Sequence, residues 1–366
     1  FLFSSRLSIY MHCRFMSIHL LLYYSSEVFK ICMFLHKTSF LQGNPLWHKL
    51  SVLLALIAAA KEPLPYSLAK NLLGWTDQEA KEYVAKVSLL FPLRDGRFSV
   101  LHKTVIDWLT KKERKGQRFH ISATMKQEAQ EKLARHCLSL VEEGKDLFPP
   151  FKKYPLRFAL VHAREVPNNE SIRERAASVL LNFPYLLRRV EDSAPKLLDD
   201  TRAMETVYKM HTQKDDQHQQ RLSRAVSLLR SALSLSMQGL LTNYKQLAGQ
   251  MVARLMMYEQ GTSGESGVAK VQLIMDFLRE VRQWSGPEDG GGWWCPMTAT
   301  YTPAGGALQA TLTGHSDYVN CVKYRPQSEK SERSMFVTAS DDTTLKVSSV
   351  RFFCVYVCVR DGVVCS

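Results

Sequence analysis

The sequence lacks the motifs on which many nucleotide-hydrolysing and acyl-transferring sites depend. The phosphate-binding pattern G-x-x-x-x-G-K-[ST] occurs nowhere, and the Gly-Lys pair at 144–145 is followed by Asp146 instead of a hydroxyl residue. Phosphate cradling needs the backbone amides of that loop and the hydroxyl that binds Mg²⁺. The G-x-S-x-G nucleophile elbow is also missing, because "GTSGESG" at 261–267 has a different spacing. These absences predict a chain that is not an enzyme and that uses no cofactor.

The cysteines do not have the spacing of a metal site. None of the eight forms a C-x-x-C pair. Cys354 and Cys358 lie close together, but neither a histidine nor a second cysteine pair completes a zinc site there. Cysteines scattered in this way are typical of free thiols in a reducing compartment. The sequence therefore predicts a cytoplasmic protein without a metal site.

Both ends of the chain have an unusual composition. Residues 1–43 are rich in aromatic residues and cysteine, yet they never reach 18 uninterrupted apolar residues, so they predict no membrane span. Residues 348–366 have a similar character. We interpret both as atypical tails that derive from non-native coding sequence, such as translated intron. The alternative for the first tail is a short membrane-associated helix.

The chain carries an excess of positive charge. Lys and Arg number 48 and Asp and Glu number 35, which gives a net charge of +13. Such an excess attracts acidic partners, and nucleic acid is the first to consider. The basic residues are spread out, however, so a cationic but ordinary surface is the favoured interpretation. With 366 residues, 45% apolar and 23% charged, the chain predicts two or three globular domains.

Residues 44–118 have the element order of a winged helix. An apolar helix at 46–60 is stopped by prolines, and a short helix follows that Gly74 closes. The third helix begins at Thr76 with capping-box spacing. The Asp-Gly pair at 95–96 predicts a hairpin of two short strands, and a further helix follows it.

Residues 119–284 predict helices only, arranged as an irregular bundle. The clearest has apolar residues at helical spacing from Leu222 to Leu240. The methionines Met251, Met256 and Met257 are interpreted as core filling instead of as a binding groove. No repeat period supports a solenoid.

Residues 285–307 are rich in glycine and proline, which predicts a linker. The paired Trp293 and Trp294 would dock this linker onto a neighbouring domain.

The segment from 308 to 347 predicts three strands. "LTGHSDYVNCVKYRP" contains a strand with a slip in its apolar phase near Cys321, "MFVTAS" is a second strand, and "DDTT" is a turn before a third. Gly314 and His315, followed by Ser340, Asp342 and Thr344, resemble the WD repeat of β-propellers. The resemblance implies a structural hydrogen-bond network of His315 and Asp342 with Thr338 or Ser340. The family's closing Trp is replaced by Ser348, which suggests that authentic sequence stops near Val347.

The region before this cassette resembles the winged-helix segment of NACHT-type STAND signalling ATPases, most specifically in "FSVLHKTVIDWLT" at 98–110. In that family a helical region and then WD repeats follow. The resemblance implies that His102 is either a nucleotide-sensing residue of the longer protein or a histidine packed against the wing.

Together these patterns predict a mainly α protein that has a winged helix, a helical bundle and a partial β-propeller blade. Since a propeller needs several blades, the single cassette implies further blades downstream. We expect a non-catalytic regulatory segment whose partners are other proteins, bound through the WD-repeat region, and an upstream NTPase module. The alternatives are a DNA-binding winged-helix protein and an inert gene-model fragment. The third helix carries Asp77, Glu79 and Glu82 against only two lysines, which disfavours specific binding of nucleic acid.

Overall fold

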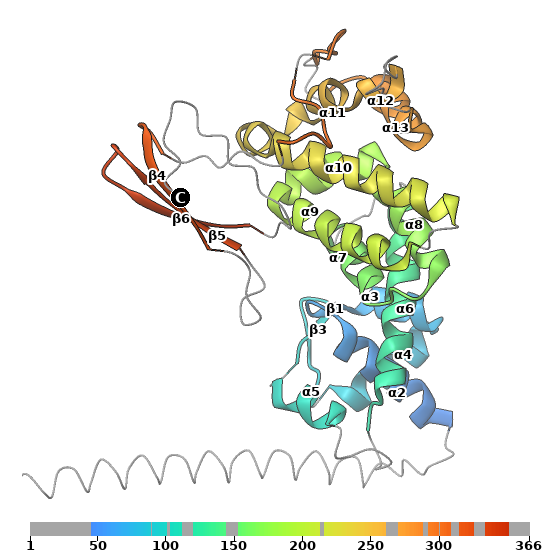
Figure 1. Cartoon of the computed structure of the whole chain (residues 1–366). Coiled ribbons are helices and arrows are strands. Elements are labelled where there is room, and N and C mark those ends of the chain that lie inside the picture. Colours follow the sequence, from blue (N-terminus) through green and yellow to red (C-terminus); the bar gives the residue numbers. More distant parts are fainter. Residues whose placement is uncertain are drawn as a thin grey trace, which may run out of the picture. The chain divides into compact units, whose positions relative to one another are not determined.

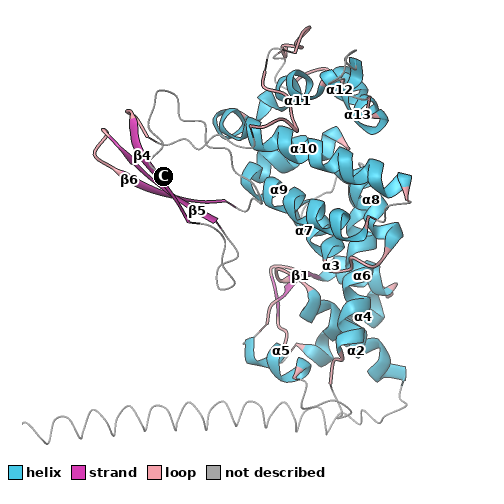
Figure 2. Cartoon of the chain, in the orientation of Figure 1, coloured by secondary structure: helices cyan, strands magenta, loops and turns pink. Residues whose placement is uncertain are grey.

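The structure is a computed structural model. It describes residues 45–88, 90–100, 103–111, 120–143, 153–212, 216–260, 270–287, 292–299, 301–308, 315–325 and 334–350. The predictions for residues 1–43, His102, Gly314 and the tail after residue 350 lie outside these ranges. The chain divides into two compact units, Phe1–Val166 and Pro167–Ser366. The described residues are mainly helical, as predicted, and they include a three-stranded sheet near the C-terminus (Figure 1, Figure 2).

The first unit combines helices with a small antiparallel sheet of strand order β1-β3-β2. Its elements are α2 (Pro45–Ala59), β1 (Leu64–Pro65), α3 (Tyr66–Leu73), α4 (Asp77–Val87), β2 (Leu93–Arg94), β3 (Arg97–Phe98), α5 (Lys103–Thr110), α6 (Ala123–Glu142) and α7 (Lys153–Arg164).

The predicted hairpin around the Asp-Gly turn is confirmed as β2 and β3. Asp95 has φ 49° and Gly96 has φ 70°, the left-handed values that a tight two-residue hairpin turn requires. β1 was not predicted, because it contains a proline. Pro65 is tolerated because β1 lies at the edge of the sheet and has one neighbouring strand, so its outer side needs no N–H donor.

The predicted end of α3 and the predicted start of α4 are also confirmed. Gly74 follows α3 in the left-handed conformation, with φ 62°, and its backbone N–H donates to the carbonyl of Asn71. α4 begins with the capping box: the Thr76 hydroxyl accepts from the Glu79 amide, and the Glu79 carboxylate accepts from the Thr76 amide. Local sequence therefore marks where α3 ends and where α4 begins.

A buried histidine holds the core of this unit together. His162, on α7, is fully buried, and its Nδ1 lies 2.5 Å from Oε1 of Gln130, on α6. Its Nε2 lies 3.0 Å from the hydroxyl of Tyr154, and Nε2 of Gln130 donates in turn to the carbonyl of Ala59, at the end of α2. Burial, with added repulsion from nearby cations, lowers the pKa of His162 to about 3. A neutral ring therefore links three helices.

The second unit begins with a run of helices and ends with the C-terminal sheet. Its elements are α8 (Glu170–Leu180), α9 (Phe183–His211), α10 (Gln217–Thr242), the 3₁₀ turn η2 (Tyr244–Gln246), α11 (Leu247–Leu255), α12 (Met257–Gln260), α13 (Gln272–Gln283), β4 (Val319–Arg325), β5 (Ser334–Ser340) and β6 (Leu345–Val350).

The apolar stripe predicted between Leu222 and Leu240 lies on α10, and most of its members are buried. The prediction that three methionines fill the core is confirmed for Met251 and Met256, which are buried, whereas Met257 is only half-buried. Three asparagine and aspartate residues begin the helices α8, α9 and α10, and each side chain accepts a hydrogen bond from the first turn.

α9 contains a kink that was not predicted. Ser193 has the non-helical angles φ −172° and ψ 102°, two residues before Pro195. Arg189 reaches across the kink: its guanidinium lies 3.3 Å from the Asp192 carboxylate and 2.9 Å from that of Asp200. Since all three side chains are nearly buried, this ion pair fixes the angle between the two halves of the helix.

The glycine- and proline-rich segment does not run free. We call residues 292–299 and 301–306 the strap. Nη1 of Arg254, on α11, donates to the carbonyl of Thr302 at 2.9 Å, and the Arg254 carbonyl accepts from the Ala304 amide at 3.0 Å. The Tyr258 hydroxyl donates to the Ala304 carbonyl at 2.6 Å, and Ala304 is buried. The strap is therefore packed against the helices of its own unit.

The C-terminal sheet is antiparallel, with strand order β4-β5-β6. The predicted slip in phase is confirmed, since the register shifts between Val319 and Cys321. β6 continues to Val350, so the predicted end of the cassette at Val347 falls inside a strand. Ser348, where the resemblance expects Trp, pairs with Phe336 of β5.

Candidate functional site

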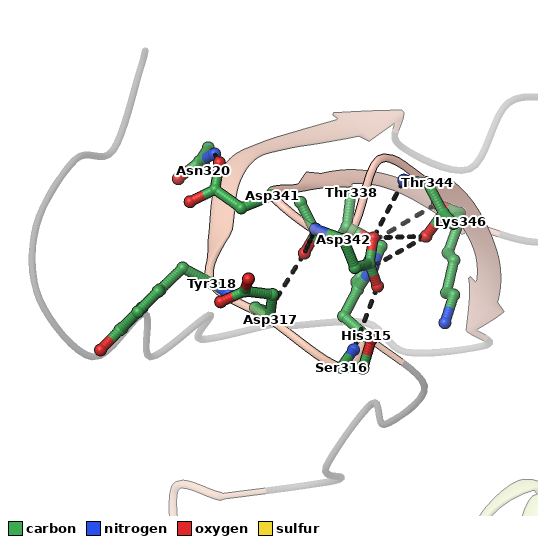
Figure 3. A network of polar contacts seen from close by, with 11 residues as sticks. His315, Ser316, Asp317, Tyr318, Asn320, Thr338, Asp341, Asp342, Thr344 and Lys346 are labelled. Carbon is green, nitrogen blue, oxygen red and sulfur yellow. Dashed lines mark hydrogen bonds and ion pairs between the residues drawn. The ribbon is translucent and has the colours of Figure 1, made fainter.

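A cluster of polar side chains joins the strands of the C-terminal sheet at one end (Figure 3). His315 and Ser316 come from the segment before β4, Thr338 comes from β5, and Asp342 and Thr344 come from the turn between β5 and β6. Residues far apart in the sequence thus meet at one place, where they form the main polar network of the sheet.

His315 lies at the centre of this network. Its Nδ1 is 2.9 Å from Oδ2 of Asp342, and its Nε2 is 2.8 Å from the hydroxyl of Thr338. The side chains of His315 and Asp342 are 10% and 7% exposed. A carboxylate only accepts hydrogen bonds, so the Nδ1 proton points to Asp342, and Nε2 forms the second contact of the ring, with the Thr338 hydroxyl. These two contacts fix the orientation of the ring.

Asp342 is satisfied from several directions. Its Oδ1 accepts from the Thr344 hydroxyl at 2.6 Å and from the Thr344 amide at 2.9 Å. Its Oδ2 accepts from the Ser316 amide at 3.0 Å, in addition to His315. The Thr344 hydroxyl makes the largest contribution to holding the pKa of Asp342 well below its usual range, against the opposing effect of burial. The group is a fixed anion that organises the turn.

Ser340 has a different place from the one that the resemblance left open. Its hydroxyl accepts from the Asp342 amide at 3.2 Å and donates to the carbonyl of Asp317 at 3.1 Å. It therefore fastens the turn to the segment before β4, whereas Thr338 is the hydroxyl that contacts His315. Thr343, at the tip of the turn, has the left-handed φ of 64°.

Sequence reasoning missed the backbone and side-chain roles of Thr344 and Ser316. An aspartate followed two residues later by a threonine is the signal for a local turn in which the carboxylate binds the backbone ahead of it. A second pair was also missed: Asn320, on β4, donates to the carboxylate of Asp341. The contact of Ser316 with Asp342 and that of Asn320 with Asp341 tie the turn to the chain around the start of β4.

The order Asp342, His315, Thr338 has the hydrogen-bond pattern of a nucleophile with its base, so its chemistry must be weighed. A nucleophile needs an open site beside it for a substrate and an oxyanion. The Thr338 hydroxyl is instead within 3.4 Å of the Lys346 carbonyl, inside the β5–β6 pairing. Open cavities of about 160, 540 and 560 Å³ are lined by residues of other elements. The arrangement fits a network that stabilises a fold.

Comparison with known proteins gives no relative. No family model, no curated protein and no solved structure matches this chain. Within the described ranges, no group of three or more metal-ligating side chains is placed to hold an ion. No helix in the part of the chain that the structure describes is both long and apolar enough to cross a membrane.

Proposed function

We propose that this chain is a non-catalytic regulatory and protein-interaction segment of a STAND-type signalling protein in the cytoplasm. In this proposal a winged helix in the first unit and the helices after it couple an upstream nucleotide module to a downstream WD-repeat propeller. The C-terminal sheet is the first blade of that propeller. The observation that carries the proposal is the network of His315, Asp342 and Thr338.

The faces of the sheet support the same proposal. Val337 pairs with Val347, and Ala339 pairs with Leu345, so these four residues lie on one face. Val337, Leu345 and Val347 are 37%, 73% and 60% exposed. An exposed apolar face of this kind is expected of a sheet that packs against another sheet, as propeller blades do.

The first unit supports the winged-helix part by its element order and its hairpin. The helices α2, α3 and α4 precede the hairpin of β2 and β3, and α5 follows it. Charged residues of the third helix, α4, form ion pairs. Nζ of Lys49, on α2, lies 2.8 Å from the Glu79 carboxylate, and Lys86 pairs with Glu82. A face whose cations are paired with carboxylates attracts phosphate weakly, so protein coupling is favoured over DNA reading.

The full-length transcript on both sides of this coding sequence tests the proposal. We expect an in-frame P-loop upstream, and further cassettes downstream with Gly-His followed by Ser-x-Asp at the spacing of residues 314 to 342. A continuous reading frame that contains neither feature would sink the proposal.

DNA binding by the whole chain separates the alternative function. Under the proposal, duplex DNA is bound weakly and without sequence preference, and the affinity falls steeply between low and physiological salt. Sequence-selective binding in the nanomolar range at physiological salt would instead establish the DNA-binding alternative.

A further inference from the structure

An open groove lies between the strap and the start of α11 in the second unit. Its volume is about 560 Å³. Trp293, Trp294 and Tyr301 of the strap line one side, and Gln246 and Gln250 line the other. Trp294 is 94% exposed and Tyr301 is 46% exposed, so large aromatic surfaces face solvent beside the groove. Exposed aromatic residues that gather at a concave site are typical of recognition surfaces.

The aromatic side of the groove is held in place before any ligand arrives. Nε1 of Trp293 donates to the carbonyl of Trp284 at 2.8 Å, which anchors one end of the strap to α13. The guanidinium of Arg254 lies over the Tyr301 ring, 5.2 Å from its centroid, and anchors the other end. Between them the backbone passes close to α11: a Cβ at Gly249 would lie 3.2 Å from the Trp294 carbonyl. The Trp293 and Tyr301 rings and the strap backbone therefore lose little conformational freedom on binding, whereas the Trp294 ring projects into solvent.

The opposite side of the groove offers hydrogen-bond donors. Oε1 of Gln250 accepts weakly from Arg254, at 3.3 Å, which leaves the Nε2 amide as a donor. Gln246 is exposed and carries a second side-chain amide. Lys245 adds a cation to the lining. None of the described lining residues carries a carboxylate.

We propose that this groove binds an extended, proline-rich segment of a partner protein. A proline residue has a carbonyl but no N–H, so a polyproline helix is rich in acceptors and poor in donors. That composition complements the amide donors of the groove. Prolyl rings pack on aromatic side chains, and aromatic-lined grooves recognise such segments in known peptide-binding domains. The site lies outside the C-terminal sheet and does not depend on the function proposed above.

Sugars are the competing ligand class, since they also stack on aromatic rings and bind amides. Sugar hydroxyls are donors as well as acceptors, and charged carboxylates are their strongest acceptors. The lining lacks such an acceptor, and the groove is open enough for a chain to continue past it. The peptide is therefore the better match.

Titration of the full chain with a fluorescein-labelled decaproline peptide tests the proposal, with fluorescence anisotropy as the readout. We expect saturable binding with a dissociation constant below about 1 mM. Trp294→Ala is expected to weaken it about tenfold or more, as expected for an exposed aromatic anchor. Gln250→Leu removes the amide donor and is expected to weaken it by a smaller factor. Met210→Ala is the matched control, because Met210 is 76% exposed but is not among the residues that line the groove.

Each other result overturns the proposal. Absence of decaproline binding up to about 1 mM does so, as does equal binding by Trp294→Ala and by the unaltered chain. Equal binding of a glycine-serine peptide of the same length would show that proline is not recognised. Binding of maltohexaose, with loss on Trp294→Ala and without decaproline binding, would make the groove a carbohydrate site. The indole N–H signal of Trp294 in a two-dimensional NMR spectrum verifies that the change occurs at this residue, and unchanged circular dichroism verifies folding.

Discussion

At the scale of single residues, His315 and His162 have contrasting structural roles. His315 lies beside the anion Asp342, which orients its ring. His162 has no charged partner and is bound by an amide and a phenol. The first arrangement fixes a turn through charge-assisted hydrogen bonds, whereas the second keeps a neutral ring inside a core.

Replacement of Thr338 by valine tests the network at His315. The change keeps the shape of the side chain and removes the hydroxyl that lies 2.8 Å from Nε2, so we expect the sheet to lose about 1 kcal/mol of stability. The readout is the rate at which Cys321, on β4, reacts with a thiol reagent in native buffer, which should rise. Cys137 is an internal control, because burial raises its pKa to about 12 and keeps it unreactive. Thr206→Val, at an exposed threonine of α9, should leave both rates unchanged.

A pH series tests His162. Its folded-state pKa of about 3 lies below the ordinary value of about 6.5, so the unfolded chain binds the proton first. The stability contribution is complete above about pH 6.5 and is lost as the pH falls toward 3, by about 1.4 kcal/mol per pH unit.

The measurement is hydrogen exchange of α6 and α7 amides at pH 7 and pH 5, corrected for the intrinsic effect of pH. His162→Asn should be less stable at pH 7 but should lose less stability on acidification. His218→Gln, at an exposed histidine of α10, is the control. An identical pH dependence in His162→Asn and the unaltered chain would contradict the assignment.

At the scale of elements, the strap depends on one glycine. Gly305 has φ +74°, and a Cβ there would lie 2.9 Å from both Cδ2 of Leu228 and the Tyr258 hydroxyl oxygen. Its amide also donates to the Ser231 hydroxyl at 2.9 Å. Backbone strain and steric overlap therefore meet at this position.

Gly305→Ala is expected to cost about 1–3 kcal/mol locally and to release the strap from α10 and α11. The neighbouring Gly306→Ala is the matched control, because its Cβ would meet only the Pro303 carbonyl, at an ordinary 3.6 Å. Limited proteolysis with chymotrypsin, which cleaves after aromatic residues such as Tyr301, reports the release through faster cleavage within the strap. Equal cleavage of the two variants would mean that the contacts at Gly305 do not hold the segment.

Sequence patterns predicted elements best where the determining interactions are local. The capping box at Thr76, the turn at Asp95 and the apolar stripe of α10 all involve residues within a few positions of one another, and each is present. The strap was predicted as a linker because its partners are distant: Arg254 and Thr302 are 48 positions apart, and composition cannot reveal such a bond. The kink at Ser193 was missed although Pro195, two residues later, is a local signal for it, and the ion pair of Arg189 with Asp200 stabilises the bend.

The same distinction applies to the candidate site. The WD-repeat resemblance placed His315 and Asp342 in one network with either Thr338 or Ser340, and the structure brings His315, Asp342 and Thr338 together. It could not decide between Thr338 and Ser340, because both alternate onto the same face of β5 and only the position of the His315 ring selects one of them. The only sequence feature that pointed to the strap groove was the pair Trp293 and Trp294, and both were expected to dock. Trp293 docks on Trp284, and Trp294 stays exposed.

At the scale of the whole molecule, the absence of a phosphate-binding loop leads to a prediction about activity. We expect purified protein to show no Mg²⁺-dependent ATPase above a buffer blank, because no glycine-rich loop supplies the amides that cradle phosphate. The control is a second preparation from a different expression host, which identifies contaminating ATPase activity. Saturable turnover that is abolished by one substitution in this chain would contradict the prediction.

The last prediction concerns how stability is distributed along the chain. α10 buries most of its length among other helices, and the C-terminal sheet leaves an apolar face of three residues exposed. The free energy of local opening increases with the number of buried contacts that a segment makes. Amides of β4, β5 and β6 should therefore exchange roughly a hundredfold or more faster than those between Leu222 and Leu240. Chains extended by downstream cassettes should narrow this gap, because the next blade would cover Val337, Leu345 and Val347. Slow exchange across the sheet in the present chain, as a soluble monomer, would mean that one blade is stable alone. The proposal that the sheet requires further blades would then fail, whatever the fate of the strap groove.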